Sequence, residues 1–221
     1  MNKVPLEKMN QYFKNHPIAH HFSFQVLEYM TVHEFQRNEW IVREGAKPDA
    51  LFYMIKGKAK IYTTHQNGKV SLINFVNPGD YIGEMELLHE NYYSKGIQAA
   101  AKTVCYSIPL NTCRTKLLED VVFLRGLAIF LSKKATFMST KSSQSHAFPL
   151  ENRLAHFILE LADQGIYREK HVTVCDYLGV SYRHLLHVLH LFCEKRYLSK
   201  EGKAYHIQNK ESLQKLADGL S

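Results

Sequence analysis

The sequence predicts an α+β protein with three parts: an N-terminal β-rich roll, a long helix and a C-terminal winged helix-turn-helix. Short apolar segments separated by glycine turns fill residues 35–109, as in a sandwich or jelly-roll barrel. Apolar residues then recur at helical spacing over residues 111–146. Two short helical segments around Gly179 precede a glycine-centred hairpin. We expect domains at residues 1–110, 111–146 and 147–221.

The composition is that of an ordinary globular protein. The 221 residues are 45% hydrophobic, and no apolar run approaches the ~18 residues of a membrane span. The first 16 residues are too polar for a signal peptide, so we expect a cytoplasmic protein that does not engage membranes. The four cysteines form no Cys-x-x-Cys pair, which favours reduced core thiols over a cluster or a zinc site.

Charge alone does not identify the partner. The net charge of +7 favours a polyanion, but residues 150–221 contain 10 Lys and Arg against 9 Asp and Glu. The C-terminal segment is therefore nearly neutral, and its function must be read from its pattern.

The N-terminal half begins with an amphipathic helix, expected over residues 4–15 and ended by Pro17. Strands are expected at residues 40–42, 51–55, 59–63, 70–76 and 96–108. Asn67-Gly68 is a strong hairpin signal between the third and fourth of these strands. Such regular short strands predict the roll.

One helix is expected over residues 111–146, with Asn111 as its cap. It carries a heptad seam about three repeats long: Leu124, Ala128, Leu131, Ala135, Met138 and Ser142. A second apolar stripe lies beside it: Phe123, Leu127, Phe130 and Phe137. One stripe can face the roll and the other a twin helix, which would make a homodimer. The alternative is a single helix that buries both stripes on its own roll.

The polar, serine-rich residues 139–148 indicate a hinge, and Pro149 is well placed to begin the next helix. Residues 174–178 then lead into Gly179, which can adopt a positive φ, and Ser181 is a good N-cap for the following helix. The apolar side of that helix comprises Leu185, Leu186, Val188, Leu189 and Phe192. The other side carries Tyr182, Arg183, His184 and His187.

Two helices around a tight turn, the second with a polar face, indicate a helix-turn-helix. Residues 197–208 form the expected β-hairpin, or wing, around Gly202. An αα-hairpin that only packs a core is the alternative. The spacing of His184, His187 and His190 could also suggest a metal, but a polar DNA-facing surface accounts for these histidines more simply.

The segment LFYMIKGKAKIYTTHQNGKVSLINFVNPGDYIGEMELL, with Gly79, Asp80, Gly83 and Glu84, resembles the β-roll of the CRP/FNR family of bacterial transcription regulators. The segments AFPLENRLAHFIL and YLGVSYRHLLHVL resemble most the YeiL-like branch of that family. The resemblance covers nearly the whole chain. It implies a cyclic-nucleotide-binding-type β-roll (a double-stranded β-helix or jelly roll), a dimerisation helix and a winged helix. It also implies a homodimer that binds palindromic double-stranded DNA and contacts RNA polymerase, as activator or repressor.

The resemblance places an effector pocket at Gly83, Glu84, Lys95, Gly96, Met138 and Ser139. In cyclic-nucleotide-binding members the glutamate holds the ribose and an Arg-Ser pair holds the phosphate. Here Lys95 and Gly96 stand at the Arg-Ser positions, and lysine lacks the planar fork of arginine. The residues therefore favour another small ligand, or none, over a cyclic nucleotide, and no cofactor is required. The N-terminal cysteine cluster of the oxygen-sensing members is absent.

The resemblance places base contacts at Tyr182, Arg183 and His187, with Ser181 and His184 beside them. Arg183 can grip a guanine edge with two hydrogen bonds. Lys200 and Lys203 on the wing suit phosphate contacts, which position the protein without specifying sequence. No hydrolase, P-loop or zincin motif is present, so we expect no enzyme activity. The alternative function is a sensor or interaction module whose winged helix contacts protein rather than DNA.

Overall fold

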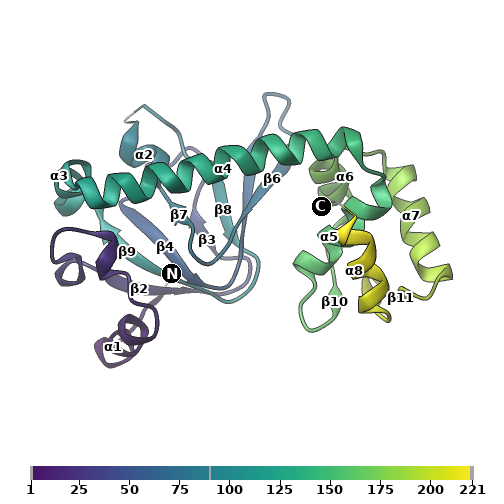
Figure 1. The fold of residues 1–221 in the computed structure, drawn as a ribbon, viewed down its shortest axis with the longest axis horizontal. Helices are drawn as coiled ribbons and strands as arrows, with labels where there is room; N and C mark the ends of the chain where they lie inside the picture. The colour runs from purple at the N-terminus through teal and green to yellow at the C-terminus, as the bar shows by residue number, and fades with distance from the viewer. Residues whose placement is uncertain (1, 90, 220–221) are drawn as a thin grey trace. The chain divides into compact units, whose positions relative to one another are not determined.

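The computed structural model describes residues 2–89 and 91–219, without the side chains of residues 2, 3, 6, 7, 141, 142 and 144–146. It forms two compact units, Met1–Lys134 and Ala135–Ser221 (Figure 1). Within the described residues, no helix is both long enough and apolar enough to cross a membrane.

The first unit is a β-roll built from two antiparallel sheets. One sheet has the order β1-β2-β9-β4-β7 and the other the order β3-β8-β5-β6. The strands of the first sheet are β1 Asn2–Lys3, β2 Thr31–Phe35, β4 Ala50–Lys56, β7 Tyr81–Ile82 and β9 Thr103–Pro109. Those of the second are β3 Trp40–Val42, β5 Ala59–Thr64, β6 Val70–Val76 and β8 Gly96–Ala99.

Alternation along β4 explains how the roll has two cores. Phe52 and Met54 point into the roll, while Leu51 and Ile55 face the helices that cover its outside. The covering helices are α1 Leu6–Asn15, α3 Leu110–Glu119 and the first part of α4 Val121–Ala147, which runs along the roll in Figure 1. Because both faces of β4 are covered, the strand reads as a continuous apolar run.

The predicted helix at residues 4–15 and the strand at residues 70–76 are confirmed. Three expectations were wrong. Residues 96–108 form two strands, β8 and β9, because Ala100 to Lys102 turn the chain between the two sheets. Residues 111–146 form two helices, because the chain leaves helical geometry at Asp120. Asn111 does not cap α3, since Pro109 occupies that position.

Asp120 ends α3 and begins α4. Its Oδ1 accepts hydrogen bonds from the backbone N–H groups of Val122 at 2.9 Å and Phe123 at 3.2 Å, which is the geometry of an N-cap. Phe123 then turns into the core, stacked on Phe22 with ring centroids 5.4 Å apart. The break therefore sets which side of α4 faces the roll.

The second unit is a winged helix-turn-helix. Its helices are α5 Leu150–Leu161, α6 His171–Leu178, α7 Tyr182–Glu194 and α8 Lys210–Asp218. Its sheet has the order β10-β12-β11, with strands β10 Ile166–Tyr167, β11 Leu198–Glu201 and β12 Ala204–Ile207. The hairpin β11–β12 turns at Gly202, which has φ +57°, and this confirms the predicted wing.

Candidate nucleic-acid interface and effector pocket

The turn between α6 and α7 has the predicted chemistry. Gly179 adopts the left-handed conformation with φ +66° and ends α6. The Ser181 hydroxyl accepts a 3.2 Å hydrogen bond from the backbone N–H of His184, so Ser181 is the N-cap of α7. The predicted cap is confirmed.

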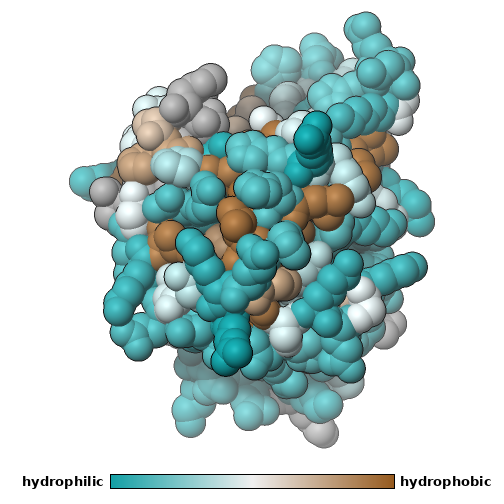
Figure 2. Space-filling view, turned by 90° about the vertical axis from the view of Figure 1, so that its right-hand side faces the viewer, coloured by the Kyte–Doolittle hydropathy of each residue, from teal (hydrophilic) through white to brown (hydrophobic). Residues whose placement is uncertain are grey.

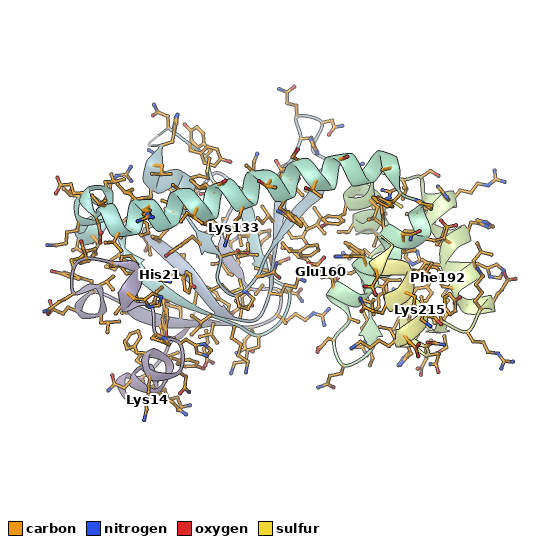
Figure 3. All side chains as sticks on the ribbon, viewed as in Figure 1. Lys14, His21, Lys133, Glu160, Phe192 and Lys215 are labelled. Carbon is orange, nitrogen blue, oxygen red and sulfur yellow. The ribbon has the colours of Figure 1, made fainter. Side chains whose placement is uncertain are left out.

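Helix α7 buries one side and exposes the other. Leu185, Val188, Leu189 and Phe192 are buried; Phe192 lies among the packed helices of this unit in Figure 3. Tyr182, Arg183, His184 and His187 are all exposed, so one surface carries all four of the predicted DNA-facing side chains. Leu186 was expected on the buried side but is 38% exposed.

His190 of α7 lies 3.3 Å from Glu194 one turn later, so it has a partner on its own helix.

The surface around α7 is mostly polar. Figure 2, which views the side on which α7 is drawn, shows a largely hydrophilic surface with small hydrophobic groups among it. Such a surface is suited to a polar partner rather than to burial in a protein core.

A histidine behind α7 links the helix to the wing. The Nδ1 atom of His171 lies 3.4 Å from the hydroxyl of Tyr182, and its Nε2 atom lies 3.5 Å from the hydroxyl of Tyr205 on β12. Burial, and then the charge of Lys200, lower the pKa of His171. This histidine was not among the predicted site residues, although it stands at the start of the first helix of the motif.

The wing and the supporting helix fix the rest of the motif. Lys200 and Lys203 are exposed on the hairpin, as a phosphate contact requires. Arg153 of α5 donates to the carbonyl oxygen of Leu178 at 2.6 Å and to that of Phe148 at 3.3 Å. It thereby satisfies a carbonyl at the end of α6, next to the turn. This arginine was not among the predicted site residues.

The effector pocket begins at a tight turn before α2 Glu84–Leu88. Gly83 has φ +91°, which favours glycine, and a Cβ there would make a tight 3.1 Å contact with the carbonyl oxygen of Ala50. The Glu84 side chain is buried, and its Oε1 lies 2.6 Å from the Nζ of Lys134. The predicted pocket carboxylate is therefore already paired with a lysine of α4.

Lys95 also has partners inside the roll. Its Nζ donates to the hydroxyl of Thr63 at 3.0 Å. Burial opposes ionisation of the Glu44 carboxyl, but hydrogen bonds from Thr64 and Thr63 and, last, the charge of Lys95 together lower its pKa. The ammonium expected to meet a phosphate is thus already hydrogen-bonded inside the roll.

Gly96 lies against an aromatic ring. A Cβ at this position would lie 2.9 Å from Cζ3 of Trp40, closer than real side chains approach. The ring of Trp40 lies edge-on to that of Tyr62, with centroids 6.3 Å apart. The indole therefore occupies the space that the serine of the Arg-Ser pattern would need.

The remaining pocket residues, Met138 and Ser139, are exposed and belong to the second unit. Their role in a pocket stays a prediction.

The two stripes of α4 differ in environment. Phe123 and Leu127 are buried in the core outside the roll, and Phe130 packs against that core in part. In the heptad seam, Leu124 and Leu131 also pack on the core in part, whereas Ala128 and Met138 are exposed, as is Ala135. The side chain of Ser142 lies outside the described residues. The dimer seam stays a prediction.

Helix α4 also exposes large apolar side chains that sequence analysis did not single out. Val122 is 47% exposed and Ile129 is 51% exposed, and the two are seven residues apart on one side of the helix. A heptad shifted by two residues from the predicted seam would have included both.

Three comparisons bear on this arrangement. The family model of the cyclic nucleotide-binding domain matches residues 32–120. The regulatory protein YeiL of Escherichia coli O157:H7 is 42% identical over 183 residues, which cover 83% of this chain and 84% of that protein. The cyclic AMP receptor protein of Thermus thermophilus is 22% identical over 88% of this chain and 92% of its own length.

Solved structures resemble the fold. A putative transcriptional regulator of the CRP/FNR family from Eubacterium rectale has a TM-score of 0.73 and 14% identity, covering 87% of this chain and 92% of its own. A transcriptional regulator of the CRP/FNR family from Thermus thermophilus has a TM-score of 0.68 and 18% identity, covering 86% of this chain and 100% of its own. At such identities the likeness concerns the fold alone.

Proposed function

The chain belongs to the CRP/FNR family of transcription regulators, and from this premise we propose that it reads a palindromic promoter site as a homodimer, through the exposed side of α7. Like its relatives, it is a DNA-binding regulator and not an enzyme. Because its target is genomic DNA, we place its action in the cytoplasm.

The observation that carries the proposal is the capped N-terminus of α7. Ser181 fixes the first turn, and Tyr182 and Arg183 project from that turn into solvent. In helix-turn-helix proteins the N-terminal residues of the second helix contact base edges in the major groove. Arg183 can donate two hydrogen bonds to guanine O6 and N7, and His187, one turn later on the helix, can donate to a base or a phosphate.

Lys200 and Lys203 complete the interface on the wing. Both are exposed, and their flexible ammonium groups suit phosphates on the DNA backbone. Because the surrounding segment is nearly neutral, few phosphates are neutralised, and the affinity should depend on salt less steeply than for a basic domain.

The homodimer rests on the exposed apolar side chains of α4. Val122 and Ile129 would be costly to leave in water on a monomer, and a second copy of the helix would cover them. A two-fold partner also matches a palindromic site, since each subunit then reads one half. RNA polymerase is the further partner expected of a promoter-bound regulator.

The roll has the fold of a cyclic nucleotide-binding domain. We propose that it works without a cyclic nucleotide. Lys95 stands where a phosphate-binding arginine would be needed, and its Nζ is hydrogen-bonded to Thr63. A lysine in that position offers a point charge rather than a fork that matches a phosphate.

The experiment is a selection of bound sequences from random duplexes with the native protein and with Arg183→Ala. The proposal is supported if the native protein selects a palindromic consensus and if Arg183→Ala loses the base preference at one base pair in each half-site. Lys215→Ala is the matched control, since Lys215 is an exposed cation on α8 rather than on α7 or the wing (Figure 3). Failure to enrich any sequence would instead point to a protein-binding winged helix.

A further inference from the structure

A buried carboxylate of the roll has its partner on the long helix. Glu84 and Lys134 are 50 residues apart in sequence, yet Glu84 Oε1 and Lys134 Nζ are 2.6 Å apart. The Glu84 side chain is 4% exposed and that of Lys134 is 35% exposed. The pair is therefore largely shielded from water on the roll side and partly open on the helix side.

A second carboxylate depends on the same lysine. Burial raises the pKa of Asp80, and the charge of Glu84 raises it further, while Lys134 and a hydrogen bond from the backbone of Asn77 act in the opposite direction. Without Lys134, the buried Glu84 and the partly buried Asp80 would repel each other with less compensation. Such an arrangement is expensive, because a buried charge needs a partner.

The lysine is held in place by aromatic neighbours. Its Nζ lies 5.7 Å from the ring centre of Phe130, and Phe130 is edge-on to Tyr81 at 5.6 Å. Tyr81 in turn lies 3.0 Å, through its hydroxyl, from Nδ1 of His21, which Figure 3 labels on the segment before β2. These contacts order the turn of α4 that carries Lys134.

Helix α4 is thus attached to the roll in two ways. Phe123 and Leu127 bury their side chains in the core near the start of the helix. Two to three turns later, the ion pair to Glu84 supplies a polar attachment directly to the turn that begins α2. The first attachment is non-directional, whereas the second fixes one side chain to one carboxylate.

We propose that Lys134 is a built-in occupant of the Glu84 carboxylate, which fixes α4 to the roll without a small-molecule effector. The chain itself supplies the cation that satisfies the pocket. A sugar hydroxyl that approached Glu84 Oε1 would compete with a 2.6 Å ion pair. The Nζ of Lys95 is already hydrogen-bonded to Thr63, so a cyclic phosphate would have to compete for that ammonium as well.

This inference deepens the proposed function, because a regulator held in this way could bind DNA without a ligand. Its DNA-binding test rests on the proposed function. The attachment itself does not depend on DNA. It can be measured in the free full-length protein, by amide hydrogen exchange over residues 121–134 of α4.

The variants are Lys134→Met, Glu84→Gln and their combination, with Lys133→Met as the matched control. Methionine keeps an unbranched apolar stem over Phe130 and removes the charge. Lys133 is the adjacent, exposed lysine on α4 and is labelled in Figure 3. We expect Lys134→Met to lower protection of these amides about tenfold or more, since removing one member of a buried pair strands the other.

Lys133→Met should leave the protection unchanged, and adding Glu84→Gln to Lys134→Met should cost little more than Lys134→Met alone. Equal protection in Lys134→Met and Lys133→Met would overturn the proposal. So would additive losses in the double variant, because they would mean that the two side chains act independently.

A measurement on the native protein keeps the proposal testable even where a variant folds poorly. Calorimetry with cyclic AMP up to about 1 mM should give no binding heat. The native protein should also bind its selected duplex equally well with and without the nucleotide. Cyclic AMP that binds and raises the affinity for DNA would overturn the proposal. A protein that binds no duplex at all would count against the DNA function, and the hydrogen-exchange result would then decide whether Lys134 attaches α4 to the roll.

Discussion

The backbone N–H of Ser23 donates a 2.7 Å hydrogen bond to Oδ2 of Asp120, 97 residues further along the chain. The other carboxylate oxygen of Asp120 caps α4 through Val122 and Phe123. One buried side chain thus ties the segment before β2 to the start of the long helix. It also marks the break between α3 and α4, where the chain leaves helical geometry.

Replacing Asp120 by alanine should destabilise the protein by about 1–3 kcal/mol, because the variant loses an N-cap and strands the N–H of Ser23. Urea unfolding of Asp120→Ala beside Glu119→Ala measures this, since Glu119 is the exposed neighbour. A loss no greater than that of Glu119→Ala would contradict the role of Asp120.

Asp120 also predicts a pH effect on stability. Burial opposes its ionisation, but backbone hydrogen bonds from Ser23, Phe123 and Val122 outweigh burial and lower its pKa. Its contribution is therefore complete above the ordinary aspartate pKa of ~3.9 and is lost as the pH falls through the lowered value. The difference in unfolding free energy between native protein and Asp120→Asn should shrink over that acidic range.

The Ser181 cap can be tested apart from DNA. Ser181→Ala should lower the free energy of unfolding by about 0.5–2 kcal/mol, because the N–H of His184 loses its acceptor. Ser181→Thr retains a hydroxyl and should stay close to the native value. If alanine and threonine behave alike in urea unfolding, the hydrogen bond is not what begins α7.

His171 predicts a second pH dependence. Burial, followed by Lys200, lowers its pKa, so the folded protein favours the neutral ring that contacts Tyr182 and Tyr205. The resulting stability is present above the ordinary histidine pKa of ~6.5 and is lost as the pH falls through the lowered value. His171→Phe should flatten stability between about pH 7 and 5, while exposed His184→Gln should not.

The dimer proposal is tested on the exposed side of α4. Ile129→Glu should shift the protein from dimer to monomer in sedimentation at micromolar concentration, because it places a charge in an apolar contact. Circular dichroism should remain native, since Ile129 lies outside the roll's core. Leu131→Glu is less informative, because Leu131 packs in part on the chain's own core. A native protein that sediments as a monomer would refute the homodimer.

Local signals made the helix-turn-helix predictable. Gly179, Ser181 and the apolar spacing of α7 each act over a few residues, and the structure confirms them together. The wing was predicted from Gly202, which stands between two segments in which apolar and polar residues alternate in places. Helix α8 was missed despite available signals: Asn209 caps it through the N–H of Ser212, and Leu213 and Ala217 lie on its buried side.

Long-range relationships explain what the sequence left unresolved. Asp120 stands in a stretch of helical periodicity, and its role depends on Ser23, which no local pattern links to it. Lys134 likewise looks like a surface lysine until α4 is laid against the roll. The pocket could be located from Gly83 and Glu84, but its occupant could not be inferred from residues so far away.

Trp40 has a consequence for how this pocket could change over evolutionary time. A substitution that gave position 96 a serine would meet the indole at once, because any Cβ there lies 2.9 Å from Cζ3 of Trp40. Trp40 is 38% exposed, so its ring must shift or be replaced before a side chain fits at position 96. Either change disturbs the edge-on contact between Trp40 and Tyr62. A serine at position 96 would therefore also change the packing between strands β3 and β5.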